Sequence, residues 1–182
     1  MDIREQKQAL RKKIRQEMQP LPPSYFQQAG KAICEKILAT DAYRQSDCVF
    51  CFVSCGKEPD TYPLLNRILS DGKVLAVPLC RSEGQMELRR ITALSQLAPG
   101  AYNIPEPPED APILSPADVQ LALIPCLAAT RDGKRLGKGG GYYDRFLTAY
   151  TGTAFLLCPA RLLQPDIPME LHDFCISTVI TE

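Results

Sequence analysis

The sequence predicts an α/β fold: a single-domain, three-layer α/β/α sandwich with a mostly parallel, Rossmann-like sheet. Segments with helical periodicity alternate with short, β-rich apolar runs along most of the chain. The most apolar run, LALIPCLA from Leu121, is typical of a central strand buried on both faces. No internal repeat, low-complexity tail or change of composition divides the 182 residues, so we expect one domain spanning residues 1–182.

Four helices are expected. From about Ile3 to Met18, apolar side chains recur at helical spacing among many charges. PLPPSY ends this helix and begins the next, because consecutive prolines are tolerated only in a first turn. A third helix is predicted in TYPLLNRILSDGK, with Thr61 as its N-cap, and a fourth from about Tyr143 to Ala149.

Strands are expected in the β-rich runs between these helices. DCVFCFVSCG, VLAVPLC, LALIPCLA, TAFLLC and CISTVIT are the predicted strands, and the alternating MELRRI indicates an exposed or edge strand. The stretch QLAPGAYNIPEPPEDAPILSP is dense in proline and is predicted to be a loop.

Composition narrows the possible functions. The 21 basic and 21 acidic residues cancel, so no global field recruits nucleic acid or an anionic membrane, and any anion site must be local. The charged N-terminal segment has no apolar run behind it, and no later run approaches a membrane span. We therefore expect a cytoplasmic monomer without a signal peptide and without nucleic-acid or membrane partners.

The eight cysteines lie mostly in apolar runs, which is typical of buried free thiols, and disulfides are not expected in a reducing cytoplasm. The spacing of Cys48, Cys51 and Cys55 resembles that of metal ligands. Successive side chains of a strand face opposite sides, however, so these thiols cannot readily converge on one ion.

The most informative stretch is GKRLGKGGGYYDR, residues 133–145. It follows the most buried predicted strand and precedes a helix, which is where open α/β sheets bind ligands. Its glycines uncover backbone N–H groups, and its cations supply charge for phosphates. The spacing of Gly137, Gly139 and Gly141 is not that of the dinucleotide fingerprint, and no Walker GK[ST] is present. A nucleotide-phosphate site of neither common type is predicted, with a flexible surface loop as the alternative.

This stretch resembles the signature of the 5-formyltetrahydrofolate cyclo-ligase (methenyltetrahydrofolate synthetase) family, an Arg-Leu-Gly-x-Gly-x-Gly-Tyr-Tyr-Asp run. KQALRKK, FVSCGKEPDT and LHDFCISTVIT resemble segments of the same family in the same order. With NIPEPP, Asn103 to Pro108, the resemblance extends over nearly the whole chain. Gly140 departs from members that carry a cation there, so that contact is either absent or supplied by Lys138.

The resemblance implies that ATP drives the cyclisation of 5-formyltetrahydrofolate to 5,10-methenyltetrahydrofolate, with ADP and phosphate as the other products. A formamide is a poor electrophile, and its oxygen is a poor leaving group. Phosphorylation of the formyl oxygen gives an imidate phosphate, which N10 then attacks as phosphate departs. This chemistry asks the protein for positioning and charge neutralisation, not for a nucleophile, and it implies Mg²⁺ as the cofactor.

The resemblance also implies which residues form the site. Those expected to bind ATP are Lys7, Arg11, Arg135, Leu136, Gly137, Lys138, Gly139, Gly140, Gly141, Tyr142, Tyr143 and Arg145. Those expected to bind the folate are Val53, Glu58, Lys138, Gly139, Gly140, Gly141 and Tyr142. Those expected to serve catalysis are Arg135, Lys138, Tyr142 and Asp144. Those expected to place Mg²⁺, directly or through waters, are Asp144 and Asp173.

Ordinary structural roles are the alternatives for several of these residues. They are a first-turn carboxylate for Asp144, a turn residue for Asp173, a solvated helix face for Lys7 and Arg11, and a loop charge for Glu58.

Two other functions also stay open: an ATP-dependent kinase or ligase for another small acceptor, and a non-catalytic nucleotide- or folate-binding module. The single histidine, His172, is a weaker candidate for a general base, because this reaction does not need one.

Overall fold

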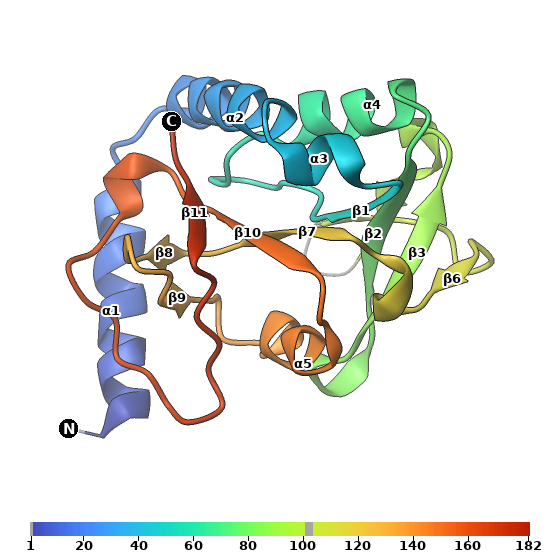
Figure 1. Ribbon diagram of the computed structural model, residues 1–182. Coiled ribbons are helices and arrows are strands. Elements are labelled where there is room, and N and C mark those ends of the chain that lie inside the picture. Colours follow the sequence, from blue (N-terminus) through green and yellow to red (C-terminus); the bar gives the residue numbers. More distant parts are fainter. Residues whose placement is uncertain (1, 101–103) are drawn as a thin grey trace.

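A seven-stranded sheet forms the centre of the computed structural model, which describes residues 2–100 and 104–182 (Figure 1). Asn103 of the NIPEPP segment therefore lies outside the described residues. The strand order is β11-β10-β7-β1-β2-β3-β6. In chain order the strands are β1 Cys48–Cys51, β2 Val74–Cys80, β3 Met86–Ile91, β6 Ile113–Leu114, β7 Leu121–Pro125, β10 Thr153–Leu157 and β11 Thr178–Ile180.

Most of this sheet is parallel, as predicted. β11, β10, β7, β1 and β2 pair in parallel, whereas β3 runs antiparallel to β2 and β6 runs antiparallel to β3. β7 lies between β10 and β1, and its residues 121–124 are fully buried. This confirms the central strand expected from the apolar run.

The far edge of the sheet differs from the sequence prediction. MELRRI forms β3 but is not the edge strand, because β6 pairs along its outer side. The proline-rich stretch predicted as a loop contains β6 and also a separate ribbon, in which β4 (Ala98–Pro99) pairs with β5 (Pro105–Glu106). Each of these strands has two residues, which is too short for an alternating pattern to be visible in the sequence.

Helices cover both faces of the sheet and give the three layers that the sequence predicts (Figure 1). Successive strand residues contribute to opposite sides of the core. Val49 and Leu121 pack with helices 23–38, 41–45 and 62–70, whereas Phe50 and Ala122 pack with helices 3–18 and 142–149. None of the helices in the described parts of the chain is long and apolar enough to span a membrane. The helices are α1 Ile3–Met18, α2 Pro23–Leu38, α3 Asp41–Gln45, α4 Tyr62–Ser70 and α5 Tyr142–Ala149.

Helix starts follow the sequence signals with one exception. Asp2 and Glu5 form a capping box at α1, and α2 opens on two prolines. Thr61 precedes α4 as predicted, but its side chain does not cap that helix. Its hydroxyl instead donates to the Phe52 carbonyl and accepts from the Ser54 amide, so it ties the segment after β1 to the start of α4.

Helix α1 is fastened to the C-terminal segment by a buried ion pair. The Lys7 ammonium lies 2.8 Å from Oε2 of Glu170 and also contacts the Asp173 carboxylate, with only 8% of the Lys7 side chain exposed. Burial lowers the pKa of Lys7, but its hydrogen bonds to Asp173 and Glu170 outweigh this and leave that pKa raised. Burial raises the pKa of Asp173, but the bonds from Lys7 and the Glu170 amide outweigh it and leave that pKa lowered.

The close approach of α2 to the segment before α4 predicts a steric requirement at Gly30. A Cβ at Gly30 would lie 2.3 Å from the Asp60 carbonyl oxygen. Gly30→Ala should destabilise the protein by about 2 kcal/mol, although alanine is favoured over glycine by about 1 kcal/mol within a helix. Urea unfolding measures this, and Gln28→Ala, at an exposed position of the same helix, is the control expected to change little. An unchanged or raised stability of Gly30→Ala would contradict the packing described.

The buried pair of Lys7 and Asp173 predicts an acid-sensitive contribution to stability. Because the folded pKa of Asp173 is lowered, its contribution is complete above the unfolded value of about 3.9 and is lost as pH falls through the folded pKa. Asp173→Asn should therefore be less stable than wild type at pH 7, and the difference should shrink below about pH 4. Urea unfolding from pH 7 to pH 3 measures both. Asp166→Asn, which removes an exposed carboxylate paired with Lys134, serves as the control with little effect.

Candidate active site

A cavity of about 720 Å³ lies at the carboxyl ends of β1, β2 and β7. Its walls come from the first half of α1, from the ends of these strands with the segment after β1, and from the glycine loop 137–141. Parallel pairing brings the carboxyl ends of the strands to one edge of the sheet, where α/β proteins bind ligands. The cavity therefore lies where the sequence predicts the phosphate site.

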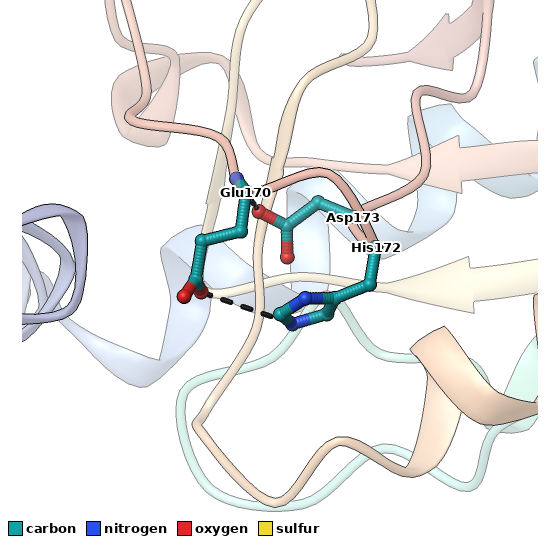
Figure 2. Close-up of side chains that lie close together, drawn as sticks. All are labelled: Glu170, His172 and Asp173. Atoms are coloured by element: carbon teal, nitrogen blue, oxygen red, sulfur yellow. Dashed lines mark hydrogen bonds and ion pairs between the residues drawn. The ribbon is translucent and has the colours of Figure 1, made fainter.

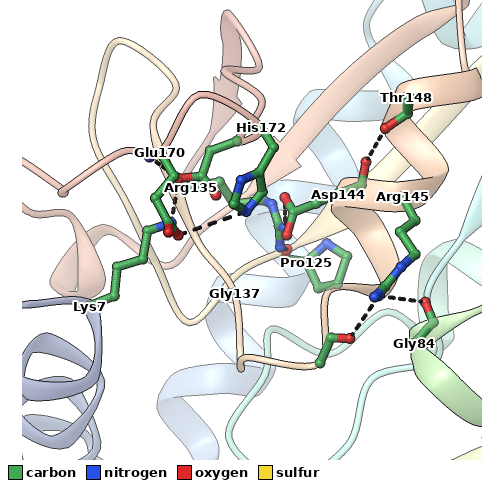
Figure 3. A network of polar contacts seen from close by, with 12 residues as sticks. Lys7, Gly84, Pro125, Arg135, Gly137, Asp144, Arg145, Thr148, Glu170 and His172 are labelled. Atoms are coloured by element: carbon green, nitrogen blue, oxygen red, sulfur yellow. Dashed lines mark hydrogen bonds and ion pairs between the residues drawn. The ribbon is translucent and has the colours of Figure 1, made fainter. Parts of the chain in front are cut away.

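All of the predicted site residues except Arg145 line this cavity. Those that line it are Lys7, Arg11, Val53, Glu58, Arg135, Leu136, Gly137, Lys138, Gly139, Gly140, Gly141, Tyr142, Tyr143, Asp144 and Asp173. The Arg145 guanidinium instead donates to the carbonyls of Gly84 and Gly140, each at 3.3 Å, and so braces the loop (Figure 3). Consecutive helix residues point about 100° apart, so Arg145 cannot share the direction of Asp144, which faces the cavity.

The glycine loop needs glycine for its backbone conformation at two positions. After β7 the chain forms a ribbon of β8 (Ala128–Ala129) and β9 (Arg135–Leu136), and the loop leads from β9 to α5. Gly139 and Gly141 have φ values of +111° and +73°, which other residues rarely adopt. Gly141 is the N-cap of α5 and no side chain caps this helix, so its first-turn amides can serve an anion.

Two contacts join the loop to the opposite walls of the cavity. Nε of Arg11 donates to the Gly137 carbonyl at 2.9 Å, which ties the loop to α1. Nζ of Lys138 lies 2.5 Å from Oε1 of Glu58, which ties the loop to the segment after β1. Lys138 is half exposed, whereas the Glu58 side chain is buried and also accepts from the Cys55 amide. Lys138, which the sequence predicts to bind ATP, is thus paired with Glu58, which the sequence predicts to bind the folate.

Beneath the loop, Arg135 and Asp144 form an ion pair. Nη2 of Arg135 donates to Oδ1 of Asp144 at 2.6 Å, and Nη1 lies 3.4 Å from the Pro125 carbonyl (Figure 3). The Arg135 guanidinium also lies over the Tyr143 ring, 5.9 Å from its centroid. Asp144 stands in the first turn of α5, where a carboxylate is also favoured by the helix dipole.

Glu170, His172 and Asp173 lie close together in the cavity lining (Figure 2). One ligand atom from each lies within 4.8 Å of the others, and Lys7 contacts both carboxylates. Sequence reasoning proposed only Asp173 from this group, although ELHD places three possible ligands within four residues. Lys7, predicted to bind ATP, would have to exchange these carboxylate partners for phosphate oxygens.

Another part of the cavity lining is apolar. Val53, which is buried, lines it together with lining residues that the sequence did not single out. These include Phe52, Pro78, Met86 and Ile104. Phe52, Pro78 and Met86 lie within predicted strands, and Phe52 and Ile104 lie in the segments FVSCGKEPDT and NIPEPP that resemble the family, but no sequence signal gave any of these four a role in the site. An apolar wall of this kind can bind a ligand that contains a flat, partly apolar ring.

Two thiols, Cys55 and Cys80, also line the cavity. Burial and, second, the charge of Glu58 raise the pKa of Cys55, and burial with the neighbouring Glu106 raises the pKa of Cys80 to about 11. Both thiols are therefore protonated at neutral pH and are poor nucleophiles.

Comparison with known proteins agrees with the resemblance carried by the glycine loop. The model of the 5-formyltetrahydrofolate cyclo-ligase family matches residues 3–182. The chain is 27% identical over 192 residues to 5-formyltetrahydrofolate cyclo-ligase of Mus musculus, covering 97% of this chain and 93% of the relative. It is 33% identical over 142 residues to that of Mycolicibacterium smegmatis, covering 73% of this chain and 72% of the relative.

Solved structures agree with the fold. The NMR structure of 5,10-methenyltetrahydrofolate synthetase from Aquifex aeolicus superposes with a TM-score of 0.84 at 25% identity, covering 96% of this chain and 88% of that one. A 5,10-methenyltetrahydrofolate synthetase from Mycoplasma pneumoniae, at 18% identity and a TM-score of 0.77, shares the fold over 96% of this chain and 98% of its own. The chain thus belongs to the 5-formyltetrahydrofolate cyclo-ligase family and is a ligase of folate one-carbon metabolism.

Proposed function

We propose that this protein uses ATP and Mg²⁺ to cyclise 5-formyltetrahydrofolate to 5,10-methenyltetrahydrofolate, releasing ADP and phosphate, as a cytoplasmic monomer. One observation carries the proposal: the glycine loop and the apolar wall border the same cavity. A phosphoryl group held by the loop and a pteridine held by the wall would therefore be neighbours. A kinase-like transfer from one to the other needs this adjacency.

The reaction begins with transfer of the γ-phosphoryl group of ATP to the formyl oxygen. That oxygen then leaves as phosphate when N10 attacks the formyl carbon and closes the ring, and N10 loses its proton. The bond broken first is the β–γ phosphoanhydride, and the bond broken second joins the formyl carbon to oxygen. Donors fixed before the reaction stabilise the charge that develops on the transferred group.

Three kinds of donor are available for the phosphates. Lys138 projects from the loop and is half exposed, and Arg11 keeps further guanidinium donors beyond the Nε that binds Gly137. The uncapped first turn of α5 supplies backbone amides. We assign the phosphates to these groups, with Lys7 joining them after it exchanges its carboxylate partners.

The folate is assigned to the apolar part of the cavity lining. Val53 and its apolar neighbours would pack against the pteridine, and the buried Glu58 carboxylate would accept a ring N–H in place of Lys138. Tyr142 also lines the cavity, with its hydroxyl 3.3 Å from the Arg81 carbonyl, and its ring would lie along the folate or the nucleotide. Gly140 and its neighbours allow a ligand to approach the backbone closely.

The carboxylates that line the cavity fit a Mg²⁺ ion. Mg²⁺ takes oxygen ligands and is commonly held by one or two carboxylates together with phosphates and waters. The Asp144 side chain is 26% exposed, and Asp173, beside Glu170, belongs to the same lining. We assign the ion to Asp144 and Asp173. When bound, it would neutralise charge on the phosphate oxygens.

The two remaining functions differ from this one in what they produce. A kinase or ligase for another acceptor would consume ATP without converting 5-formyltetrahydrofolate. A binding module would retain both ligands without releasing phosphate. The formation of the methenyl product therefore separates all three.

The proposal is tested by following methenyl-folate absorbance after mixing the protein with 5-formyltetrahydrofolate, with and without Mg-ATP. We expect product only with Mg-ATP, one phosphate released per product formed, and a loss of at least about 100-fold in Asp144→Asn. The Asp166→Asn variant, which alters an exposed carboxylate outside the cavity, should keep wild-type activity. Folded protein that binds ATP but forms no product would refute the cyclo-ligase mechanism.

The role assigned to Lys138 is tested by replacing two lysines of the same segment. Lys138→Met removes the exposed ammonium at the cavity and should raise KM for ATP by about tenfold or more, because a charge-assisted contact to phosphate is lost. Lys134→Met makes the same change at a lysine that pairs with Asp166 outside the cavity, and should leave KM unchanged. Initial rates over a range of ATP concentrations measure both. Equal KM values in the two variants would remove Lys138 from the phosphate site.

A further inference from the structure

Arg145 does not line the cavity, but its guanidinium joins two backbone segments that do. Nη1 donates to the carbonyl of Gly84, in the turn between β2 and β3, and to the carbonyl of Gly140, in the glycine loop (Figure 3). The two segments lie very close together, since a Cβ at Gly84 would lie 2.5 Å from the Gly140 carbonyl oxygen. The Tyr142 hydroxyl adds a bond to the Arg81 carbonyl of the same turn. One nitrogen of Arg145 therefore ties the loop to this turn.

The bond to Gly140 sets the direction of the peptide that joins Gly140 to Gly141. The described residues contain no cis peptide bond, and in a trans peptide the C=O and N–H groups point in opposite directions. Because the Gly140 carbonyl points to Arg145, the Gly141 N–H points away from it, and Gly141 itself lines the cavity. Within the described parts of the chain this N–H has no hydrogen-bond partner. It is a donor available to a ligand.

This peptide has glycine on both sides, so no side chain resists its rotation. Turning it over changes ψ of Gly140 and φ of Gly141, and glycine accepts either sign of φ. The next peptide is already fixed, because the Gly141 carbonyl accepts from the Arg145 amide at 3.1 Å. A reversed peptide would present a carbonyl oxygen in place of the N–H and would repel phosphate oxygens. The Arg145 side chain therefore holds one of two accessible orientations.

We infer that Arg145 is a positioning residue: by holding the Gly140 carbonyl, its guanidinium keeps the Gly141 N–H directed at the phosphates, which Arg145 itself does not touch. This inference rests on the proposed function, in which the loop binds the transferred phosphoryl group. A donor that is fixed before the reaction stabilises the developing charge without a cost for reorientation. The anchor at Gly84 matters for the same reason, because a guanidinium bound at two points cannot follow a turning peptide.

The first test measures the rate of methenyl formation in three variants. Arg145→Met removes the donors and should lower kcat by about tenfold or more, with KM for 5-formyltetrahydrofolate within about twofold of wild type, because the apolar wall is untouched. Arg145→Lys should keep kcat within about threefold of wild type, because both bonds come from one nitrogen that an ammonium can replace. Arg131→Met makes the same change at an exposed arginine outside the cavity and should match wild type.

The second test observes the Gly141 amide and does not depend on turnover. In nitrogen–proton NMR spectra, a non-hydrolysable ATP analogue with Mg²⁺ should shift the Gly141 signal of the wild type and of Arg145→Lys. Arg145→Met should lose most of this shift, because its Gly141 N–H is no longer held toward the ligand. A role in stability alone would leave the shift of the folded variant unchanged.

The inference is overturned if Arg145→Met keeps the wild-type kcat, or if its Gly141 signal shifts as far as that of the wild type. Wild-type protein without methenyl formation would refute the proposed function, whereas the Gly141 signal would still test Arg145. If Arg145→Met does not fold, Gly84→Ala replaces it, because the added methyl group would displace Nη1 of Arg145 and the Gly140 carbonyl from each other. Gly84→Ala should lose the same shift, and a full shift of its Gly141 signal would overturn the inference.

Discussion

The parallel pairing of β10, β7, β1 and β2 is the constraint on which the rest of the structure depends. Parallel strands place their carboxyl ends together, so the segments that leave β1, β2 and β7 must all turn at one edge of the sheet. The apolar wall and the glycine loop come from these segments. Helix α1 closes the third side and is held there by the contacts of Lys7 and Arg11. The site is therefore a consequence of sheet topology and not of any one motif.

Charge in this site is balanced locally. Three of its cations already have carboxylate partners: Lys7 pairs with Glu170 and Asp173, Arg135 with Asp144, and Lys138 with Glu58. A buried charge without a partner is costly, so this pairing keeps the ligand-free site stable. In the pair of Lys138 and Glu58, half of the lysine side chain is exposed, so this pair is accessible to a ligand that would exchange partners with it.

Much of the fold could be predicted because its signals are local. The helical stripe of α1, the prolines that open α2 and the apolar run of β7 each specify one element within a few residues. The short α3, the two-residue strands and the true edge of the sheet were missed, because such short elements depend on tertiary partners. The same division holds in the site. The glycine motif located the loop, but the partners of Lys7 and the contact of Arg145 with Gly84 depend on chain segments far away in the sequence.

The bond between Lys138 and Glu58 links the two halves of the cavity energetically. In the proposed function each of its partners serves a different ligand, so the first ligand to arrive must break the bond and the second finds it already broken. Each ligand then raises the affinity for the other by the same factor, as thermodynamic reciprocity requires. The enzyme would therefore fill its two subsites cooperatively, which favours the ternary complex over the binding of ATP alone and limits wasteful hydrolysis.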